Sequence, residues 1–497
     1  MRPLGERREV LVVSDGPVPG LPITDGLLKI WEREHTHGAA PPPLTGDRFS
    51  RLDFITWMSA TPPESDRRLP RHMEAAYLDR PDLQKAFPEV NHGDLRGFSW
   101  WAHLWGRYEI PSFRLLGHVV PPPIRITTGG RIDGGVDVVG FLTAEHGIGE
   151  ASRLIVCALQ AANVPLSTIN YKNTQSRQNC DFPVDDVGRF RTVIAAVNAE
   201  LNQPLRDHLG EHFFKGTYVI GQWFWELETA PPWYKPAYTL VDELWAPTRF
   251  IEEMLRREAP KRVQVRYMPL PLREPRVSEG VTKSDLGIPD RFMFLFTFDF
   301  MSVMKRKNPL GLVEAFERAF PDDDGPVLVL KSINGSARPE GSAMLRDAIG
   351  DAPNIIWIDR YMDADQSAAL MNLCDCYVSL HRSEGLGLTI AEAMLLGKPV
   401  IATGYSGNLD FMTPDTSFLV SWTKVKVGEG AEAYDPKARW AEPDLDEAGR
   451  LMRRVVENLE EARTRAKRGR LDLLARFSPE ATGRLMKERL KETWRTM

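Results

Sequence analysis

The sequence predicts an α/β protein built from two doubly wound parallel sheets in series, facing each other across a cleft and preceded by a mainly helical extension. Two alternations of strand-like and helix-like segments carry this prediction, one beginning at Gly134 and the other at Phe292. In each alternation, short apolar runs are followed by loops and then by amphipathic segments. The proline-rich residues 268–275 separate the two and indicate a crossover between domains.

The first alternation opens with VDVVGFL at residues 136–142, an apolar run typical of a buried strand. After the loop HGIGEAS, apolar residues recur at helical spacing at Leu154, Ile155, Ala158 and Leu159 and predict a helix. VPLSTINY then predicts a second strand, which completes the β-loop-α-β unit of a parallel doubly wound sheet. TVIAAVN, TYVIGQWFW and ELWAPT continue the series as strands that end in polar or aromatic loops.

The second alternation opens with FMFLFTFDF and continues through the strands PVLVLKSI, NIIWID, CDCYVSL and KPVIAT. The amphipathic segments between them predict helices, one with Pro309 in its first turn and one capped by Asp363 or Asp365. A further helix, LTIAEAMLLG, ends at Gly397. Long charged helices close the chain from about residue 445 onward.

The beginning of the chain has a different composition. It contains AAPPPLTG, TPPESDRRLP and VVPPP, with helix-like stretches rich in Trp and Leu between them. We interpret VVPPP, residues 119–123, as an extended linker. The expected organisation is therefore an extension at 1–130, a first sheet domain at 131–275, a second at 276–475, and a helix at 476–497 that crosses back to the first sheet domain.

Composition excludes several classes of protein. A net charge of -5 gives no indication of nucleic-acid binding, and 42% hydrophobic with 26% charged residues fits a globular chain. No apolar run approaches the roughly 18 residues needed to span a membrane, and the first apolar run is too short for a signal peptide. We interpret Cys374 and Cys376, two of four cysteines, as small core residues of a cytoplasmic protein.

The strongest candidate for a binding site is SLHRSEGLGLTIAEAMLLGKPVIAT, residues 379–403. A strand ends at Leu380, a loop with two glycines follows, and a helix starts near Thr389. Ligands of open parallel sheets bind at the carboxyl ends of strands, and a helix N-terminus offers N–H groups to an anion. Glu384 in the loop and Glu392 in the helix can accept hydrogen bonds from ligand hydroxyls. The segment therefore predicts a site for a phosphate with polyols beside it, against the alternative of a helix with solvated glutamates.

A second candidate is the basic loop in FTFDFMSVMKRKNPLGLVEAF, residues 296–316. It contains Lys305, Arg306 and Lys307 after the carboxyl end of a predicted strand. Preorganised cations at such a place can stabilise the charge of a departing phosphate group. Lys331, at the end of the strand PVLVLK, is a weaker candidate for the same cleft.

Residues 379–403 closely resemble the signature of retaining glycosyltransferases with the GT-B fold, the large group 1 family (family 4) that includes sucrose synthase and bacterial mannosyltransferases. The resemblance implies two Rossmann-like domains, of which the second binds a nucleotide-sugar donor. It implies that Glu384 faces the donor sugar and that Glu392, after seven intervening residues, holds the ribose. The backbone that it assigns to the sugar and diphosphate is that of Gly385, Leu386, Gly387 and Leu388.

The basic loop resembles the phosphate-binding loop of the same family, in which an Arg and, five residues later, a Lys clamp the diphosphate. Lys307 falls on the family Lys, whereas Ser302 stands at the position of the Arg. Arg306 or Lys305 can replace the missing Arg from a nearby backbone position. The resemblance thus implies that Lys307 and Arg306 act with Glu384 in catalysis, and that Lys305 belongs to the donor site.

GFLTAEHGIGEASR, residues 140–153, resembles the glycine loop of the first domain of these enzymes, which lies across the cleft from the donor. A plain tight turn is an equal explanation of its two glycines. The residues that we place on the acceptor side here are His146, Gly147, Gly149 and Glu150. For His146, a position on the surface is the alternative to a polar contact with the substrate.

WFWELETAPPW and VDELWAPT resemble segments of related bacterial enzymes. Trp225 and Glu226 can form part of an acceptor wall, because sugars stack on aromatic rings, although core packing is the stronger explanation for most of these tryptophans. Asp-x-Asp occurs at 322–324 and 363–365, which we interpret as a surface turn and a helix cap. We therefore expect no catalytic metal and no cofactor apart from the nucleotide sugar as co-substrate.

We expect transfer of a hexosyl group to a glycan, lipid-linked or small-molecule acceptor. A nucleotide-sugar epimerase, a sugar phosphorylase on the same fold and an inactive sugar-nucleotide-binding subunit are the alternatives. From Arg450 to Met497 there are fourteen Lys and Arg against seven Asp and Glu. Such a helix can touch the inner membrane face through anionic lipid, but a helix crossing back to the first sheet domain is the stronger interpretation.

Overall fold

The computed structural model describes most of the chain. The described residues are 12–18, 21–36, 41–42, 44, 48–62, 69–90, 94–102, 106, 109–116, 127–174, 176–277, 280–322, 325–431 and 434–496. The proposed linker at 119–123 and Asp323–Asp324 of the first Asp-x-Asp pattern lie outside these residues. The chain divides into two compact units, of which unit 1 comprises Met1–Ile124 with Lys172–Arg177 and unit 2 comprises Arg125–Tyr171 with Gln178–Met497.

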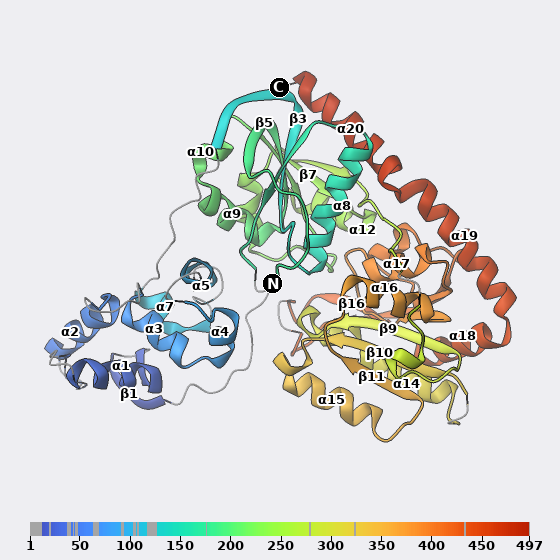
Figure 1. Cartoon of the computed structure of the whole chain (residues 1–497), viewed down its shortest axis with the longest axis horizontal. Helices are drawn as coiled ribbons and strands as arrows, with labels where there is room; N and C mark the ends of the chain where they lie inside the picture. Colours follow the sequence, from blue (N-terminus) through green and yellow to red (C-terminus); the bar gives the residue numbers. More distant parts are fainter. Residues whose placement is uncertain are drawn as a thin grey trace. The chain divides into compact units, whose positions relative to one another are not determined.

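Unit 1 is mainly helical. A hairpin of β1 and β2 is followed by short helices, as Figure 1 shows in blue. The bounds of these elements are β1 Val12–Val18, β2 Leu21–Thr24, α1 Asp25–Thr36, α2 Arg48–Ser59, α3 Arg71–Leu78, α4 Pro81–Ala86, α5 Leu95–Trp101 and α7 Pro111–Leu116. Two apolar clusters hold the unit together, one around Phe98 and one around Phe54. The buried Arg71 adds an ion pair with Glu34 at 2.6 Å.

Unit 2 begins with a six-stranded parallel sheet in the order β4-β3-β5-β6-β7-β8. Its strands alternate with helices, as the series of apolar runs predicts. The strands are β3 Thr127–Gly140, β4 Leu166–Asn170, β5 Val187–Ala196, β6 Tyr218–Gln222, β7 Glu243–Ala246 and β8 Gln264–Tyr267. The helices are α8 Gly147–Ala161, α9 Asn202–Leu209, α10 Glu211–Phe214, α11 Tyr234–Ala237 and α12 Arg249–Glu258.

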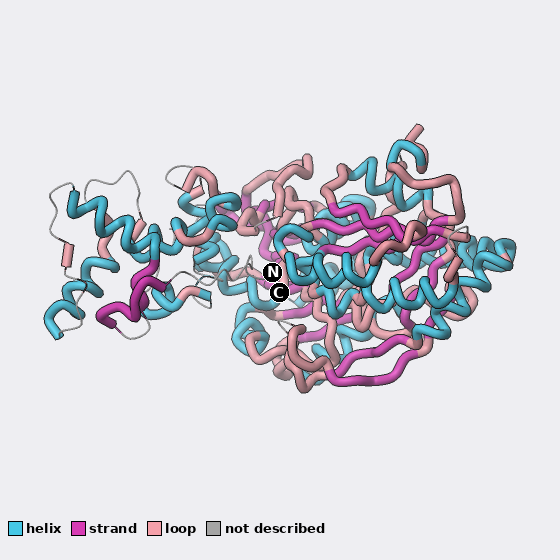
Figure 2. The backbone as a smooth tube through the Cα atoms, turned by 90° about the horizontal axis from the view of Figure 1, so that it is seen from below, coloured by secondary structure: helices cyan, strands magenta, loops and turns pink. Residues whose placement is uncertain are grey.

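A second six-stranded parallel sheet follows, in the order β11-β10-β9-β12-β13-β14. In Figure 2 the strands of unit 2 are magenta and lie among cyan helices. The strands are β9 Met293–Asp299, β10 Val327–Ile333, β11 Ile355–Asp359, β12 Cys376–Ser379, β13 Val400–Thr403 and β14 Phe418–Val420. The helices are α13 Met304–Lys307, α14 Pro309–Ala319, α15 Pro339–Ile349, α16 Ala364–Leu373 and α17 Leu388–Leu395. Two doubly wound domains confirm the predicted fold class.

The strand orders fix where a ligand can bind. In the second sheet the chain runs outward from β9 to β11 and then returns to place β12 on the other side of β9. In the first sheet the same reversal lies between β3 and β5. Loops diverge at such a switch point and leave a crevice at the carboxyl ends of the strands. The loops that the sequence singles out follow β3, β9 and β12, so all three leave a strand that borders a switch point.

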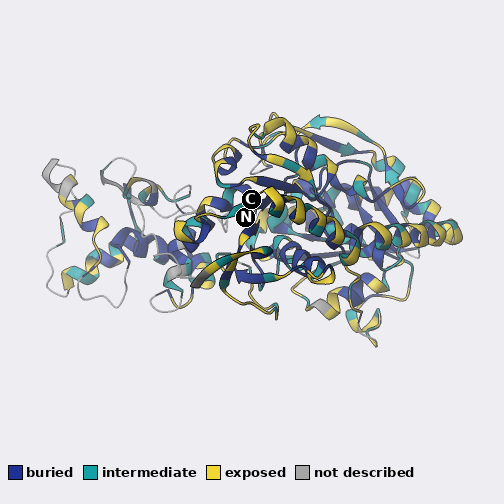
Figure 3. Ribbon diagram, turned by 90° about the horizontal axis from the view of Figure 1, so that it is seen from above, coloured by how far each residue is buried: buried dark blue, intermediate teal, exposed yellow. Residues whose placement is uncertain are grey.

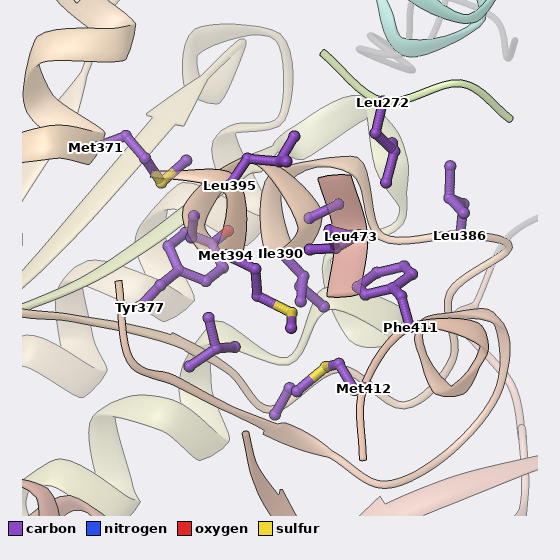
Figure 4. Close-up of a cluster of buried hydrophobic side chains, with 14 of the residues drawn as sticks. Leu272, Met371, Tyr377, Leu386, Ile390, Met394, Leu395, Phe411, Met412 and Leu473 are labelled. Carbon is purple, nitrogen blue, oxygen red and sulfur yellow. The ribbon is translucent and has the colours of Figure 1, made fainter. Parts of the chain in front are cut away.

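The chain ends in three helices, α18 Leu445–Glu457, α19 Leu459–Phe477 and α20 Pro479–Thr496. Leu473 of α19 packs on Ile390, Met394 and Leu395 of α17 in one apolar cluster (Figure 4). Helix α20 returns to the first sheet domain, where a Cβ at Gly483 would collide with the carbonyl of α8.

An ion pair fixes α20 to the first sheet. Arg489 donates to both carboxylate oxygens of Glu243 on β7, at 2.9 and 2.6 Å. The Glu243 side chain is fully buried, and Tyr218 and Trp245 also donate to it. The central strands β6, β7, β12 and β13 are buried almost throughout, whereas α19 exposes its outer face (Figure 3).

Cys374 and Cys376 lie in the core, as the sequence predicts. Cys374 and Cys376 are buried beside and within β12, and the thiols of all four cysteines are unpaired. Burial raises the pKa of Cys374 to about 12, so its thiol is inert. Among the described residues, no helix is both long and apolar enough to cross a membrane.

Candidate functional site

The loop after β9 is a strained turn that presents the basic residues. Val303 has φ of 60° and Asn308 has φ of 57°, so both lie in the left-handed region on either side of the one-turn helix α13. For a β-branched residue such as Val303 this backbone is an outlier and costs on the order of 1–3 kcal/mol. Asn308 ties the turn to the other loop by donating to the carbonyl of Leu380 at 2.9 Å. Strain of this kind is found where the surrounding structure must hold side chains in one place.

Arg306 and Lys307 converge on Glu384, which is 77 residues away in the loop after β12. Nη1 of Arg306 lies 3.0 Å from Oε2 of Glu384, and Nζ of Lys307 lies 2.6 Å from Oε1. Arg306 and Glu384 are buried, at 4% and 8% exposed, and the side chain of Lys307 is 16% exposed. We call these three residues the ion cluster.

The charges of the ion cluster set its protonation. Burial acts to raise the pKa of Glu384, but the charges of Arg306 and Lys307 outweigh it and hold that pKa at about 2. Burial lowers the pKa of Lys307, with Glu384 opposing that change and Arg306 adding to it. The two cations thus set the direction for Glu384, and burial sets it for Lys307. The three residues of the ion cluster by themselves carry one more positive than negative charge.

Arg306 has unused hydrogen-bonding capacity. Its Nη1 donates to the carbonyl of Ser383 at 2.9 Å and its Nη2 to the carbonyl of Ser302 at 3.2 Å. Its Nε is buried and has no hydrogen-bond partner among the described residues. A buried N–H without a partner is costly, and it can be satisfied by a ligand oxygen.

The N-terminus of α17 lies directly after the Glu384 loop. Gly387 precedes the helix with φ of 90°, and no side chain caps the first turn. The first-turn N–H groups are thus available to an anion, which the helix dipole also favours. Ser406 and Gly407 fix the backbone of Glu384. The Ser406 hydroxyl accepts from the N–H of Glu384, and the N–H of Gly407 donates to the carbonyl of Glu384.

Glu392 sits one turn into α17 and is half-buried. Burial, with a smaller contribution from the charge of Glu150, raises the pKa of Glu392 to about 7. Glu150 belongs to the glycine loop of the first sheet domain, where Arg153 donates to it at 2.9 Å. The structure thus brings a carboxylate from each sheet domain within electrostatic reach of the other.

The segment after β6 faces the Glu384 loop from the first sheet domain. The Ser383 hydroxyl donates to the carbonyl of Glu226, and a Cβ at Gly385 would lie 3.2 Å from the carbonyl of Trp225. Oε1 of Glu226 lies 3.8 Å from Nη2 of Arg306. Trp225 and Glu226 are therefore next to the ion cluster.

His146 acts as the N-cap of α8. Its Nδ1 accepts from the N–H of Gly149 at 3.1 Å, and its Nε2 is buried without a partner among the described residues. Burial lowers the pKa of His146 to about 3, so the ring is neutral near pH 7. Gly149 approaches the carbonyl of Ala144 too closely for a side chain, whereas Gly147 borders open space.

Two of the predicted cations lie apart from the ion cluster. Nζ of Lys305 donates to the carbonyls of Val427 and Glu429, at 2.8 and 3.0 Å. Nζ of Lys331 donates to the carbonyl of Ser332, and burial lowers the pKa of Lys331 to about 8. Of the three consecutive basic residues, only Arg306 and Lys307 reach Glu384.

The Asp-x-Asp pattern at 363–365 contributes a cap. Asp363 accepts from the N–H of Gln366 at 2.7 Å at the start of α16. Within the described residues, no group of three or more His, Cys, Asp or Glu side chains is arranged to hold a metal ion.

Two residues near the cluster were missed by the sequence reasoning. The hydroxyl of Tyr434 donates to Oε2 of Glu226 at 3.0 Å. His381 is fully buried behind the Glu384 loop, where its Nδ1 lies 3.0 Å from the hydroxyl of Ser379. His381 lies inside the motif at residues 379–403, so the sequence could have indicated it as a site residue. Tyr434 lies outside every motif, so the sequence gives no signal for it.

Comparison with known proteins gives a family match and a shared fold. The family model Glycosyl transferases group 1 matches residues 300–426, a segment that holds the whole ion cluster. Comparison with curated proteins finds no match.

Solved structures share the fold at low identity. Sucrose-phosphate synthase from Thermosynechococcus elongatus has a TM-score of 0.54 at 15% identity, over 73% of this chain and 100% of that one. HepE from Anabaena, in complex with UDP and glucose, has a TM-score of 0.51 at 14% identity, over 72% and 100%. A glycosyltransferase from Rickettsia africae has a TM-score of 0.51 at 14% identity, over 74% and 98%. Residues 300–426 thus match the model of the glycosyl transferases group 1 family, and the chain shares the GT-B fold of these structures.

Proposed function

We propose that the chain transfers a hexosyl group from a nucleoside-diphosphate sugar to a hydroxyl of a glycan, lipid-linked or small-molecule acceptor, with retention of the anomeric configuration. The observation that carries this proposal is the ion cluster at the switch point of the second sheet. Arg306 and Lys307 contact different carboxylate oxygens of Glu384, in the segment that matches the family model. Glycosyl transfer needs both signs of charge at one place, cations for the leaving diphosphate and a carboxylate beside the donor sugar.

The diphosphate has a natural position between the basic turn and α17. Lys307 and the free Nε of Arg306 supply positive charge, and the uncapped first turn of α17 supplies backbone N–H groups. Arg306 is thereby our candidate for the role of the family Arg that Ser302 replaces. Lys305 is engaged with Val427 and Glu429 and is the weaker candidate.

The sugar and the ribose are assigned to the two glutamates. Glu384 is ionised, since its pKa is about 2, and a carboxylate beside the donor sugar stabilises positive charge that develops on the ring. Glu392 on α17 is our candidate for the ribose. Glu392 titrates near neutral pH, so we expect this contact to depend on pH.

The acceptor would enter from the first sheet domain. Trp225 and Glu226 border the ion cluster there, and the charge of Glu150 in the glycine loop acts on Glu392. His146 is neutral and has a free buried Nε2, which suits a hydrogen bond to a substrate hydroxyl. In retaining transfer the acceptor attacks from the face that the diphosphate leaves, with a diphosphate oxygen taking the acceptor proton.

We propose that the chemistry proceeds without a divalent ion. Arg306 and Lys307 together contact the single carboxylate of Glu384, and two cations placed in this way can neutralise the leaving group as a metal does in other enzymes. HepE, one of the structures with the same fold, is in complex with UDP and glucose, which makes UDP and UDP-sugars the first ligands to try.

A thermal-shift screen with UDP, GDP, ADP and their sugar conjugates tests the proposal first. A ligand that binds the folded state alone raises Tm, by an amount set by its concentration relative to Kd. The sugar conjugate that gives a shift is then incubated with the protein, and hydrolysis or transfer is followed by NMR of the anomeric proton. Release of the α-anomer from an α-linked donor supports retention. A protein that binds no nucleotide, or that binds one and never breaks the glycosidic bond, contradicts the proposal.

A further inference from the structure

A hairpin is inserted between the last strand of the second sheet and α18. Its strands are β15 Trp422–Lys426 and β16 Arg439–Pro443, which pair with each other and form a sheet of their own. We call the described part of residues 422–443 the arm. The arm belongs to neither six-stranded sheet, so its presence needs an explanation other than the sheet architecture.

The arm is anchored to both loops of the ion cluster. Lys305, next to Arg306 in the basic turn, donates to two carbonyls of the arm. Arg382, two residues before Glu384, forms a two-point pair with Glu442 at 2.7 Å for each bond. Such fork-like pairs fix orientation as well as position. These contacts therefore fix the position of the arm relative to the ion cluster.

From this anchored position the arm places Tyr434 against the ion cluster. The Tyr434 side chain is 6% exposed, and its ring lies 5.3 Å from that of Trp225. Its hydroxyl donates to Oε2 of Glu226, whose other oxygen lies 3.8 Å from Nη2 of Arg306. A chain of contacts thus runs from the arm through Glu226 to Arg306 and on to Glu384.

The distance between Glu226 and Arg306 decides what this series of contacts can do. At 3.8 Å, Glu226 attracts Arg306 but does not hydrogen-bond to it, since such bonds are about 2.7–3.2 Å long. The Glu226 side chain is 25% exposed, so it is less enclosed than Arg306, whose side chain is 5% exposed. Without the Tyr434 hydroxyl, Glu226 can move closer to Arg306 and form a hydrogen bond with Nη2. The carboxylate would then compete with a diphosphate for the guanidinium.

We propose that Tyr434 is a positioning residue for the donor site, because it holds Glu226 away from Arg306 and keeps the guanidinium available to the diphosphate. The inference rests on the proposed function, and it adds a residue outside the matched segment 300–426 to the donor site. Tyr434 does not touch the diphosphate and acts through Glu226.

Tyr434→Phe tests the inference, with binding of UDP, GDP and ADP measured by calorimetry. The ring is kept, so packing on Trp225 is retained, and we expect affinity for the bound diphosphate to fall about tenfold, the value of a hydrogen bond to a charged group. Tyr405→Phe is the matched control. Tyr405 donates to Glu228 at 3.0 Å, which is also a tyrosine–glutamate contact between the two sheet domains, but Glu228 pairs with Lys424 instead of Arg306. Its loss should change affinity by less than about twofold.

Removal of the competing carboxylate gives an independent test. Glu226→Gln alone should bind the diphosphate at least as tightly as the wild type. The double variant Tyr434→Phe with Glu226→Gln should bind the diphosphate with the same affinity as Glu226→Gln. A neutral amide lacks the negative charge that attracts Glu226 to the guanidinium, so it competes poorly with a diphosphate. This rescue separates positioning from a structural role, since a damaged fold would not be repaired by a second substitution.

The outcomes are distinct. If the wild type binds a diphosphate and Tyr434→Phe binds it equally well, the positioning role is wrong and the proposed function stands. A tenfold loss in Glu226→Gln, or no rescue in the double variant, also overturns the role. If the wild type binds none of the three diphosphates, the proposed function and the inference both fail.

Discussion

Replacement of Glu384 by Gln removes the one carboxylate of the ion cluster and keeps its shape. In the wild type, Glu384 has a pKa of about 2 against its ordinary 4.5, because Arg306 and Lys307 outweigh the effect of burial. At 1.36 kcal/mol for each pH unit, the ion cluster stabilises the fold by about 3 kcal/mol at pH 7 through this group. The Gln variant loses that contribution, and Arg306 and Lys307 lose the carboxylate that they share.

The pH dependence of this effect has a definite sign. The folded-state pKa of Glu384 is depressed, so its contribution is present above pH 4.5 and is lost as pH falls from 4.5 toward 2. The stability difference between wild type and Glu384→Gln should therefore be largest at neutral pH. It should shrink to about half near pH 3.

Urea unfolding at a series of pH values measures the difference, and the same variant tests catalysis. If Glu384 stabilises positive charge on the donor sugar, Glu384→Gln should lower kcat by several orders of magnitude with a smaller change in donor KM. A folded variant with full kcat would refute the placement of the sugar beside Glu384. A stability difference that is absent at pH 7, or constant down to pH 3, would refute the electrostatic account of the ion cluster.

Four further predictions concern the donor site and the C-terminal helix. Lys307→Ala should lower kcat/KM by about 30- to 1000-fold, the effect of losing about 2–4 kcal/mol of transition-state stabilisation, as measured by steady-state kinetics. For Glu392, whose raised pKa makes ionisation costly below about 7, donor KM should fall as pH rises through 7, and Glu392→Gln should raise KM and abolish this dependence. Transfer assayed after dialysis should continue in excess EDTA, and an activity that only Mg²⁺ or Mn²⁺ restores would contradict the proposal. Arg489→Ala should destabilise the fold by about 3 kcal/mol in urea, because it leaves the buried Glu243 without its guanidinium.

Two of these substitutions have matched controls in the chain. Lys305→Ala removes a neighbouring cation whose ammonium is engaged with the arm, so its kinetic effect should be smaller than that of Lys307→Ala. Arg484→Ala removes an exposed cation from the same helix as Arg489 and should change stability by less than about 0.5 kcal/mol. Equal effects in either pair would mean that general charge, and not the specific contact, is what matters.

The fold could be predicted because the spacing of apolar residues distinguishes strands from helices even in short segments. Apolar runs such as FMFLFTFDF mark buried parallel strands, and the helices between them have matching apolar faces. The rule that ligands bind at strand ends then pointed to the loops after β9 and β12. Those loops contain Arg306, Lys307 and Glu384, which the structure brings together. The sequence distance of 77 residues was no obstacle, since topology alone places the two loops side by side.

Side-chain direction was beyond the sequence. Lys305, Arg306 and Lys307 lie on one helical turn, so their side chains differ by about 100° in direction from one residue to the next. Which of them faces Glu384 depends on the phase of the turn. The phase is set by the left-handed backbone at Val303, and no sequence pattern predicts that conformation for a β-branched residue.

Other features lack a local signal for a different reason. His146 caps α8 through a ring nitrogen, whereas the expected cap residues are Ser, Thr, Asp and Asn. Tyr434 comes from a hairpin that is inserted after the last strand of the sheet, 42 residues beyond Glu392. Its role arises only when the arm and the segment after β6 meet, so it follows from tertiary contacts and has no motif of its own.

The position of Arg306 connects donor binding to the contact between the two sheet domains. Its guanidinium lies between Glu384 of the second domain and Glu226 of the first, at 3.0 and 3.8 Å. A diphosphate that binds to Arg306 must change both of these interactions, because the guanidinium then interacts with three anions in one site. By linkage, whatever alters the Glu226 contact then alters diphosphate affinity, and the diphosphate alters the Glu226 contact by the same free energy. Donor binding and the packing of the two domains at this point are therefore expected to be coupled.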